Sequence, residues 1–461
     1  MAPRRTVSRS RVLLIRVPLV AAVGANQAAP QIYGTQTTYF DRHLKNQVAK
    51  QGNLFVEQAF GKGQQWIMSL GWSASFSDNL TTRGQPIENV QTVDPSIRAT
   101  WHSQYIASNG TNPATTQVAN PYQTGSSLIP FQGGLSGRTI QQQIPLTPYP
   151  LLWGATLDGS RGYGSYNSLQ ASLSHSFTSG LNLRMNYTWS KELDYVTTPV
   201  EDGQGVNAGG TVGTPDLINN RLNRNYGLAD VPHRFVATVV YTSPFGKNGK
   251  HALENPIARF VAGGWSLGSV ISLQGGMPIV VSMTNGALTS RVDRVPGVDV
   301  QVPKALQRRY DGKTTVTLPC GKTVTPSNFQ LLKYNACAFS GRTVTGANGN
   351  LLQDIYWIGN QPQTSGDIRG LARYNVDLSL RRAFPIYERY RIEISGEATN
   401  VLNNAQWNNS ANNTTGSLGN TILRNSSGGQ IPGLGDNTNY GTLNVNSFDP
   451  RQIQLHARFI F

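Results

Sequence analysis

The side chains that most often carry out catalysis or bind metals are few in this chain, and their spacing suits neither task. No H-E-x-x-H, C-x-x-C, G-x-S-x-G or phosphate-binding P-loop pattern occurs. The glycines of Gly203-Gln204-Gly205 lie in a segment of low complexity, and no helix is expected to follow them. Six histidines are present, and none is paired at metal-ligand spacing: His43, His102, His175, His233, His251 and His456. We therefore predict that the chain is not an enzyme and uses no metal or cofactor.

Charged side chains alternate along two segments near the C-terminus. Asp377, Glu393 and Glu397 share a face with Arg381 and Arg391 if both segments are strands. A carboxylate pair for general acid–base catalysis would need a cleft around it. Charges that line a water-filled lumen need no such cleft, and we favour this second interpretation.

The only two cysteines, Cys320 and Cys337, lie in one polar region. They could remain free thiols. We favour a disulfide that joins the two ends of a long loop in an oxidising compartment.

The composition argues against several protein classes. Charged residues make up 14% of the 461 residues, compared with roughly 25% in an average soluble domain. The net charge is +15, but the basic residues are dispersed rather than clustered, so we expect no nucleic-acid partner. No apolar run approaches the roughly 20 residues of a membrane-spanning helix. Transmembrane β-strands are only about 10 residues long and apolar on one face.

Strict alternation of apolar and polar residues is the strongest pattern in the chain. Leu181, Leu183, Met185, Tyr187 and Trp189 alternate with polar residues, and a short Gly-containing link joins this run to a similar one before it. Such a pair of runs predicts a β-hairpin. The same period predicts nine strands, at residues 53–60, 65–78, 165–177, 181–193, 232–244, 260–283, 373–384, 389–401 and 451–461.

The links between these strands alternate in length. Short or medium links at 61–64, 178–180, 245–259 and 385–388 alternate with long ones at 79–164, 194–231, 284–372 and 402–450. If the strands run up and down, every long link falls at the same end. Outer-membrane barrels have this asymmetry, with short periplasmic turns and long outer loops.

Two architectures share the period of two. A soluble antiparallel sandwich buries one face of each sheet, whereas a transmembrane barrel turns its apolar face to lipid. Link lengths favour the barrel, and so do aromatic residues near strand ends, which suit the membrane interface: Trp66, Tyr187, Trp189, Tyr195, Tyr390 and Phe461. We predict an all-β fold, a partial antiparallel transmembrane β-barrel made of C-terminal strands with long extracellular loops.

Six stretches resemble, in order, the C-terminal barrel of Oar-like TonB-dependent outer-membrane receptors, a type that often carries a carboxypeptidase-regulatory-like domain. They are SYNSLQASLSHSFTSGLNLRMNYTWSKELDY, DVPHRFVATVVYTSPFG, GGWSLGSVISLQGGMPIVV, RYNVDLSLRRAFPI, ISGEATNVLNNAQW and the final DPRQIQLHARFIF. The resemblance covers residues 31–461. It implies that the last strand, with Phe459 and Phe461, carries the C-terminal signal read by the barrel-assembly machinery.

The remaining residues, 1–30, form an atypical leader. Arginines precede an apolar run as in a secretory signal, but Arg16 and Pro18 interrupt that run. We expect either a defective signal or a non-native start. The family's plug domain is not recognisable, so contact with the TonB complex is expected only through a plug missing from this chain.

The resemblance implies an outer-membrane receptor or transporter that binds or takes up an unknown ligand. The loops are rich in Asn, Thr, Gly and Tyr, a composition that is compatible with a glycan or a peptide and selects neither. Loop aromatics are the expected ligand contacts: Trp101, Trp153 and Trp357. Membrane lipid and lipopolysaccharide are the expected surroundings, in the bacterial cell outer membrane. Two alternatives stay open, a plug-less structural or adhesive barrel and a non-functional fragment of a receptor gene.

Overall fold

The structure is a computed structural model of the whole chain. It describes residues 38–40, 43–82, 93–122, 135–147, 150–151, 156–175, 180–194, 224–227, 229–245, 254–279, 281, 292–308, 310–319, 321, 323–325, 331–357, 359–362, 364–387, 390–404, 442–443 and 450–461. The predicted leader at residues 1–30 lies outside this part of the chain.

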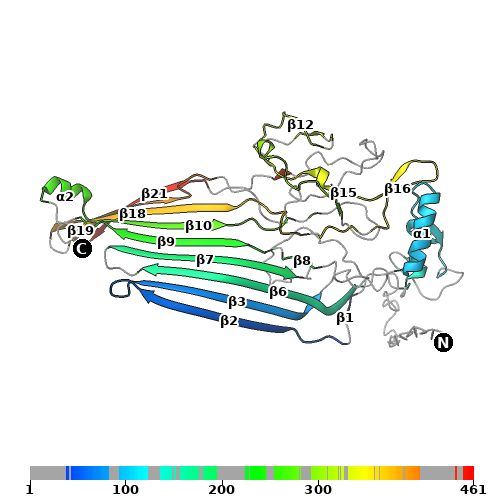
Figure 1. Ribbon diagram of the computed structural model, residues 1–461, viewed down its shortest axis with the longest axis horizontal. Coiled ribbons are helices and arrows are strands. Elements are labelled where there is room, and N and C mark those ends of the chain that lie inside the picture. The colour runs from blue at the N-terminus through cyan, green and yellow to red at the C-terminus, as the bar shows by residue number, and fades with distance from the viewer. Residues whose placement is uncertain are drawn as a thin grey trace, which may run out of the picture.

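One large antiparallel sheet dominates the molecule (Figure 1). Nine long strands follow one another in the sheet in the order of the sequence. They are β2 (Val48–Phe60), β3 (Trp66–Thr82), β6 (Thr156–His175), β7 (Leu181–Asp194), β9 (His233–Thr242), β10 (Trp265–Gln274), β18 (Arg373–Tyr387), β19 (Tyr390–Thr399) and β21 (Gln452–Ile460). Each predicted strand corresponds to one of these, which confirms the all-β fold.

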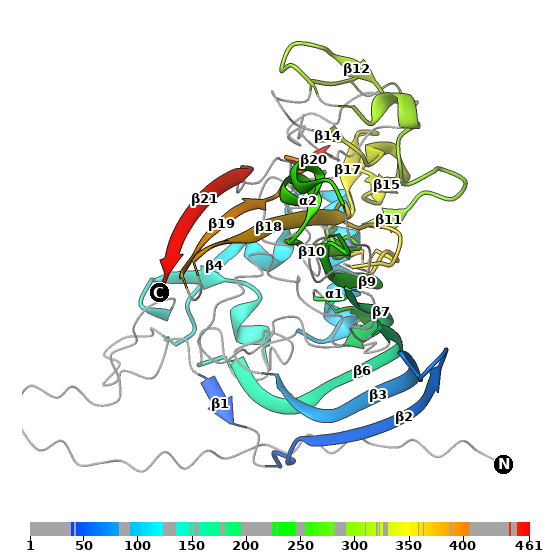
Figure 2. The same ribbon diagram turned by 90° about the vertical axis from the view of Figure 1, so that its left-hand side faces the viewer.

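The sheet curves into a trough that does not close on itself (Figure 2). Among the described strands, β2 pairs along its length with β3 alone, and β21 pairs with β19 alone. Two short strands add to the sheet away from this path, because β1 (Thr38–Phe40) pairs in parallel with β6 and β8 (Asn225–Tyr226) pairs with β7. The partial barrel expected from the sequence is thus an open, curved wall.

The links contain only short elements. These are the helices α1 (Pro95–Ala107) and α2 (Pro256–Ala262), the single-turn helices η2 (Pro113–Thr115), η4 (Ile144–Leu146), η6 (Lys304–Leu306) and η7 (Ala336–Ala338), and the strands β4 (Gln117–Ala119), β5 (Thr139–Gln141), β11 (Asp293–Arg294), β12 (Val316–Thr317), β13 (Thr323–Val324), β14 (Leu331–Leu332), β15 (Phe339–Ser340), β16 (Thr343–Thr345), β17 (Leu351–Gln353) and β20 (Thr442–Leu443). In the described part of the chain, no helix is long and apolar enough to cross a membrane.

The predicted strand at 260–283 was too long at both ends. At its start the chain forms α2 instead, because the Asn255 side chain accepts hydrogen bonds from the N–H groups of Ile257 and Ala258 and Pro256 opens the helix. At its end, the backbone of Gly276 lies so close to Gly370 that an added Cβ would be 1.9 Å from the Gly370 carbonyl oxygen. Only glycine allows this approach, and the ladder of β10 stops before it, at Gln274.

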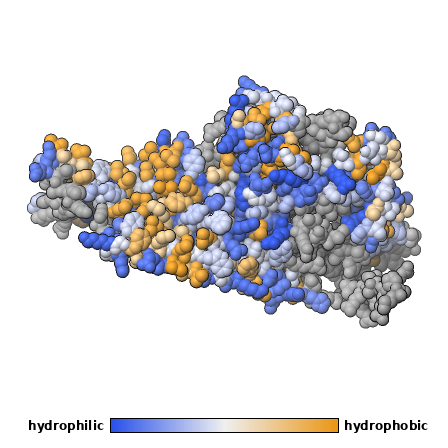
Figure 3. All heavy atoms as spheres, viewed as in Figure 1, coloured by the Kyte–Doolittle hydropathy of each residue, from blue (hydrophilic) through white to orange (hydrophobic). Residues whose placement is uncertain are grey.

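The register separates apolar from polar side chains on the two faces of the wall. Trp72, Leu169 and Trp189 are opposite one another on β3, β6 and β7. On the other face, Ser73, Ser168 and Ser190 occupy the next row. Apolar residues gather over the strands on the face seen in Figure 3.

This apolar face is uncovered. Leu455 is 81% exposed and Leu54 is 67% exposed. Since a water-soluble sandwich would bury such a face against a second sheet, the exposure favours contact with lipid.

The two ends of the wall differ, as the link lengths predicted. The links after β3, β7, β10 and β19 leave from the end of the wall where α1, β12, β15 and β16 lie, and the short turns and α2 lie at the opposite end (Figure 1). We call the described residues within 83–155, 195–232, 275–372 and 400–451 the loop layer. Among the described residues, every buried apolar side chain except Ala74, Leu183 and Ala237 belongs to this layer.

The largest of its cores lies within the third long link. Tyr334, Leu332 and Ile368 are fully buried there, and Cys337 packs against the same cluster. Cys337 is disulfide-bonded. Its predicted partner Cys320 lies outside the described residues, so the pairing with Cys320 stays a prediction.

We expect the variant in which both Cys320 and Cys337 are replaced by serine to lose about 3 kcal/mol of loop-layer stability, because a closed loop of about 15 residues restricts the unfolded chain by that amount. Urea-induced loss of protease protection in residues 292–371 measures the effect. Reduction of the wild-type protein should reproduce it. Two free thiols in the unreduced, unfolded wild-type protein would contradict the predicted bond.

Candidate functional site

The loop layer is held together by contacts between long links that are far apart in the sequence. The Tyr105 hydroxyl of α1 donates to the Gln353 carbonyl oxygen at 2.7 Å, and the Tyr356 hydroxyl donates to Asn112 Oδ1 at 2.7 Å. Burial raises the pKa of Tyr356 to about 12, so its hydroxyl stays protonated and can donate. The first and third long links therefore form one packed unit.

A histidine and a buried carboxylate lie in the same contact. His102 Nε2 is 3.1 Å from Asp354 Oδ1, and Arg342 Nε is 3.7 Å from Asp354 Oδ2. The Asp354 side chain is almost fully buried between these two neighbours, which favours a structural contact over a freely accessible base. Among the described residues, no group of three or more His, Cys, Asp or Glu side chains could hold a metal ion.

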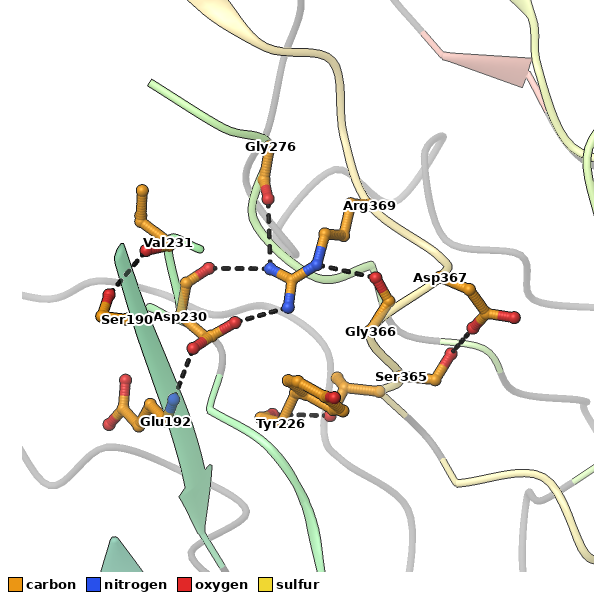
Figure 4. Close-up of polar contacts among 11 residues, drawn as sticks. Ser190, Glu192, Tyr226, Asp230, Val231, Gly276, Ser365, Gly366, Asp367 and Arg369 are labelled. Atoms are coloured by element: carbon orange, nitrogen blue, oxygen red, sulfur yellow. Dashed lines mark hydrogen bonds and ion pairs between the residues drawn. The ribbon is translucent and has the colours of Figure 1, made fainter. Parts of the chain in front are cut away.

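A second contact joins the loop layer to the wall (Figure 4). The Arg369 guanidinium donates to Asp230 Oδ2 at 2.5 Å, to the Asp230 carbonyl oxygen at 3.1 Å and to the Gly276 carbonyl oxygen at 3.2 Å. Asp230 Oδ1 also accepts a hydrogen bond from the backbone N–H of Glu192 on β7. The Asp230 side chain is 1% exposed and that of Arg369 is 14% exposed, so both charges are removed from water.

Aromatic and basic side chains surround this ion pair. The Arg369 guanidinium lies over the Tyr226 ring of β8 at 5.2 Å, and Lys191 lies over the same ring at 5.1 Å. The Tyr334 hydroxyl bonds with the backbone of Arg369 as both donor and acceptor. We call Asp230 and Arg369 with these neighbours the rim latch, because it fixes the second and third long links to the ends of β7 and β9.

A lysine beside the rim latch has little contact with water. Lys333 Nζ donates to the carbonyl oxygens of Arg369 and Gly370 at 2.9 and 3.3 Å. Loss of solvation lowers the pKa of Lys333 from its ordinary value of 10.5 to about 8. Folding therefore removes this ammonium group from water, and the free-energy cost of doing so depends on pH.

The three tryptophans predicted to contact a ligand differ in exposure. Trp101 is 4% exposed and packs with Val93 and Ala114, so its ring supports the loop layer from inside. Trp153 lies outside the described residues. Trp357 is 36% exposed.

Trp357 is held in a fixed orientation. Its indole N–H donates to Asp293 Oδ2 at 2.7 Å, and the Arg342 guanidinium lies 4.1 Å above its ring. An amphipathic ring flanked by a cation and a carboxylate can bind a polar ligand by stacking and hydrogen bonding.

The polar face of the wall carries the charges that the sequence assigned to a lumen. Register places Asp377, Arg381 and Glu397 on that face with Ser379 and Ser395. A groove of about 310 Å³ runs across β9, β10, β18 and β19, and its lining includes Thr238, Ser379 and both carboxylates. The arrangement fits a hydrated surface, and it brings no nucleophile and base together.

The apolar face ends near the loop layer in a basic pocket. It has a volume of about 420 Å³, and its charged lining residues are Lys191, Arg224 and Asp78, so basic residues outnumber the one carboxylate. Phe76, Tyr163 and Asn167 also line it. Phe76 and Asn167 belong to the same face as Trp72 and Leu169. The pocket therefore lies just beyond the apolar band, where the head groups of an outer leaflet would be.

The last strand carries its aromatic residues at the short-turn end. Phe459 is 55% exposed and Phe461 is 86% exposed. Phe459 stacks with Tyr390 at 6.0 Å between ring centroids. This accessibility is compatible with an assembly signal at Phe459 and Phe461, which stays a prediction.

Sequence patterns did not reveal the rim latch. Asp230 was noted only within the stretch DVPHR, and its partner Arg369 lies 139 residues further along the chain. No local spacing links two such residues. The alternation predicts that β7, β9, β10 and β18 are neighbours in the sheet. That order is the one sequence signal that could have suggested a contact between the links at the loop-layer ends of these strands.

Replacing either Asp230 by asparagine or Arg369 by methionine should destabilise the loop layer by about 3–5 kcal/mol, because each change leaves a buried charge without its partner. Urea titration with protease protection of residues 292–371 measures this. The exposed pair Lys50–Asp78, with side chains 68% and 52% exposed, is the control, and Lys50→Gln should change stability by less than about 1 kcal/mol. Equal effects at the two pairs would contradict the structural role of the latch.

The stability of the loop layer should rise as the pH increases from about 8 toward 10. Within this range the unfolded chain holds the Lys333 proton and the folded chain releases it, so folding is favoured at higher pH, and the full penalty applies below pH 8. Lys333→Met should flatten this rise, and the exposed Lys313→Met should leave it intact. Urea midpoints at pH 7.5 and 9.5 measure this rise. If the midpoint rises equally in the wild type and in both variants, Lys333 is not its cause.

The family of this chain follows from comparison with known proteins. No curated protein sequence matches the chain. Among solved structures, the ferripyoverdine receptor of the outer membrane of Pseudomonas aeruginosa is similar over 92% of this chain and 29% of its own, with 9% identity and a TM-score of 0.33. The outer membrane transporter YddB from Escherichia coli is similar over 94% of this chain and 35% of its own, with 9% identity and a TM-score of 0.34.

The chain thus spans about a third of the length of these two structures. The match to a family model is far more extensive. The model of the outer membrane beta barrel domain matches residues 5–454, which is nearly the whole chain. An apolar outer face, a polar inner face and loops gathered at one end agree with that match, and the chain belongs to the outer membrane beta barrel domain family.

Proposed function

We propose that this chain forms part of the wall and the outer loop layer of an Oar-like TonB-dependent receptor, which binds or takes up a glycan or a peptide. The observation that carries the proposal is the loop layer itself. Its long links have their own buried cores and interlock through Tyr105, Tyr356 and the rim latch. A packed layer at one end of a membrane wall can hold a ligand-binding surface in a fixed shape.

In this proposal the ligand first meets the exposed side of the loop layer. Trp357, with Arg342 and Asp293 beside it, is the contact that the structure supports best. Trp153 remains a second candidate from the sequence. The hydrated face of the wall, with Asp377 and Glu397, would then border the path of the ligand.

The other partners follow from the surroundings of the wall. We assign the basic pocket with Lys191 and Arg224 to the phosphate groups of lipopolysaccharide. The barrel-assembly machinery would read Phe459 and Phe461. Force from the TonB complex would act on a plug, and this chain would supply the wall and loops around it.

Fractionation of cells that express the native locus tests the proposal. An antibody against residues 292–325 should detect the protein in the outer membrane at the mass of a full receptor. In the same cells, in vivo cross-linking should recover TonB with it.

The other outcomes separate the alternatives. A band near the 50.1 kDa of this chain in the outer membrane, without TonB, would favour a plug-less structural or adhesive barrel. A signal confined to the soluble fraction would refute a membrane function. Surface labelling of Lys313→Cys but not Lys62→Cys in intact cells is the control for orientation. Lys62 lies in the turn between β2 and β3, and Lys313 precedes β12 toward the opposite end (Figure 1).

A further inference from the structure

The short helix α2 exposes an apolar surface at the end of the wall opposite to the loop layer. Ile257, Phe260 and Val261 are 74%, 63% and 64% exposed. Their spacing of three and four residues puts them on one side of the helix. Three large apolar side chains so exposed on seven residues are unfavourable in water.

The helix is fixed to the wall rather than hanging freely from it. Trp265 Nε1 donates to the Val261 carbonyl oxygen at 2.8 Å, and Ser243 Oγ donates to the Ala262 carbonyl oxygen at 2.8 Å. The Phe260 and Phe384 rings are 5.7 Å apart. These contacts determine which side of α2 faces outward.

The residues that hold α2 belong to the apolar face of the wall. Register places Phe384 of β18 opposite Ile392 of β19, which is opposite Phe459 of β21. The apolar side of α2 therefore continues the lipid-facing surface past the last row of the strands. It lies at the short-turn end, away from the loop layer (Figure 1).

A cation is placed at this boundary. The Arg382 guanidinium lies 4.4 Å from the Phe384 ring, 5.1 Å from the Phe260 ring and 5.4 Å from the Trp265 ring. Aromatic and basic side chains with this arrangement are typical of the level of lipid head groups. The ring cluster thus marks the interface, and α2 lies beside it.

We propose that α2 is an interfacial anchor, whose Ile257–Phe260–Val261 side inserts among the acyl chains of the inner, phospholipid leaflet of the outer membrane. The continuity with the lipid-facing wall selects lipid as the occupant, and the short-turn end of such walls is periplasmic. This anchor depends on the outer-membrane location given by the family and not on receptor function. An experiment can therefore refute the α2 anchor without refuting the proposed receptor function, and can refute the receptor function without refuting the anchor.

Spin labels on single cysteines test the anchor. Ile257→Cys and Val261→Cys are the probes, because both side chains are exposed and their replacement should not disturb the fold. The protein is expressed from its own locus, labelled, purified and reconstituted in vesicles of phosphatidylethanolamine and phosphatidylglycerol. Collision rates with oxygen, which concentrates in lipid, and with a water-soluble nickel chelate are then measured.

We expect both probes to collide with oxygen at least threefold more than with the nickel chelate, as does a label at Leu455→Cys on the apolar face. Lys62→Cys, in the β2–β3 turn at the same end, should show the opposite preference. If residues 257 and 261 behave like residue 62, the anchor is refuted. If they are nickel-accessible in vesicles but shielded from both reagents in native outer membranes, a protein covers α2 and the lipid proposal is equally refuted.

Discussion

In the hydrocarbon of a membrane, each backbone N–H and C=O group needs a partner within the protein, and the remainder of this structure depends on that constraint. The ladder from β2 to β21 satisfies it for every strand with two neighbours. The outer edges of β2 and β21 have no strand partner within the described sheet. In lipid, the polar groups along these edges need hydrogen-bond partners, because a bare edge would leave a row of them unsatisfied.

The wall and the loop layer are stabilised in different ways. The wall has almost no interior of its own, and its long strands depend on backbone pairing and on lipid around residues such as Leu54 and Leu455. The loop layer is exposed to water and has buried cores like those of a small soluble domain. The rim latch connects the loop layer to the wall, since Arg369 belongs to the loop layer and Asp230 contacts the backbone of β7.

Local patterns predicted the wall well because strand period and link length are local properties. The nine strands of the wall follow from alternation, and the grouping of long links at one end follows from their order. Alternation failed at the start of the predicted strand 260–283, where residues 260–262 belong to the helix α2. Features that depend on tertiary packing could not be predicted from local patterns. The burial of Trp101 and the exposure of Trp357 are one example. The contact between Asp230 and Arg369, which are 139 residues apart, is another.

The asymmetry of the wall also restricts where recognition can occur. Along the strands, one face must match lipid and the other must stay hydrated, so neither is free to vary in shape. The short turns leave little chain at their end. Only the long links can fold into new surfaces, and here they use buried tyrosines, an ion pair and a disulfide-bonded Cys337 to do so. In the receptor function proposed above, ligand specificity would therefore reside in the loop layer, and the wall would hold this layer outside the membrane.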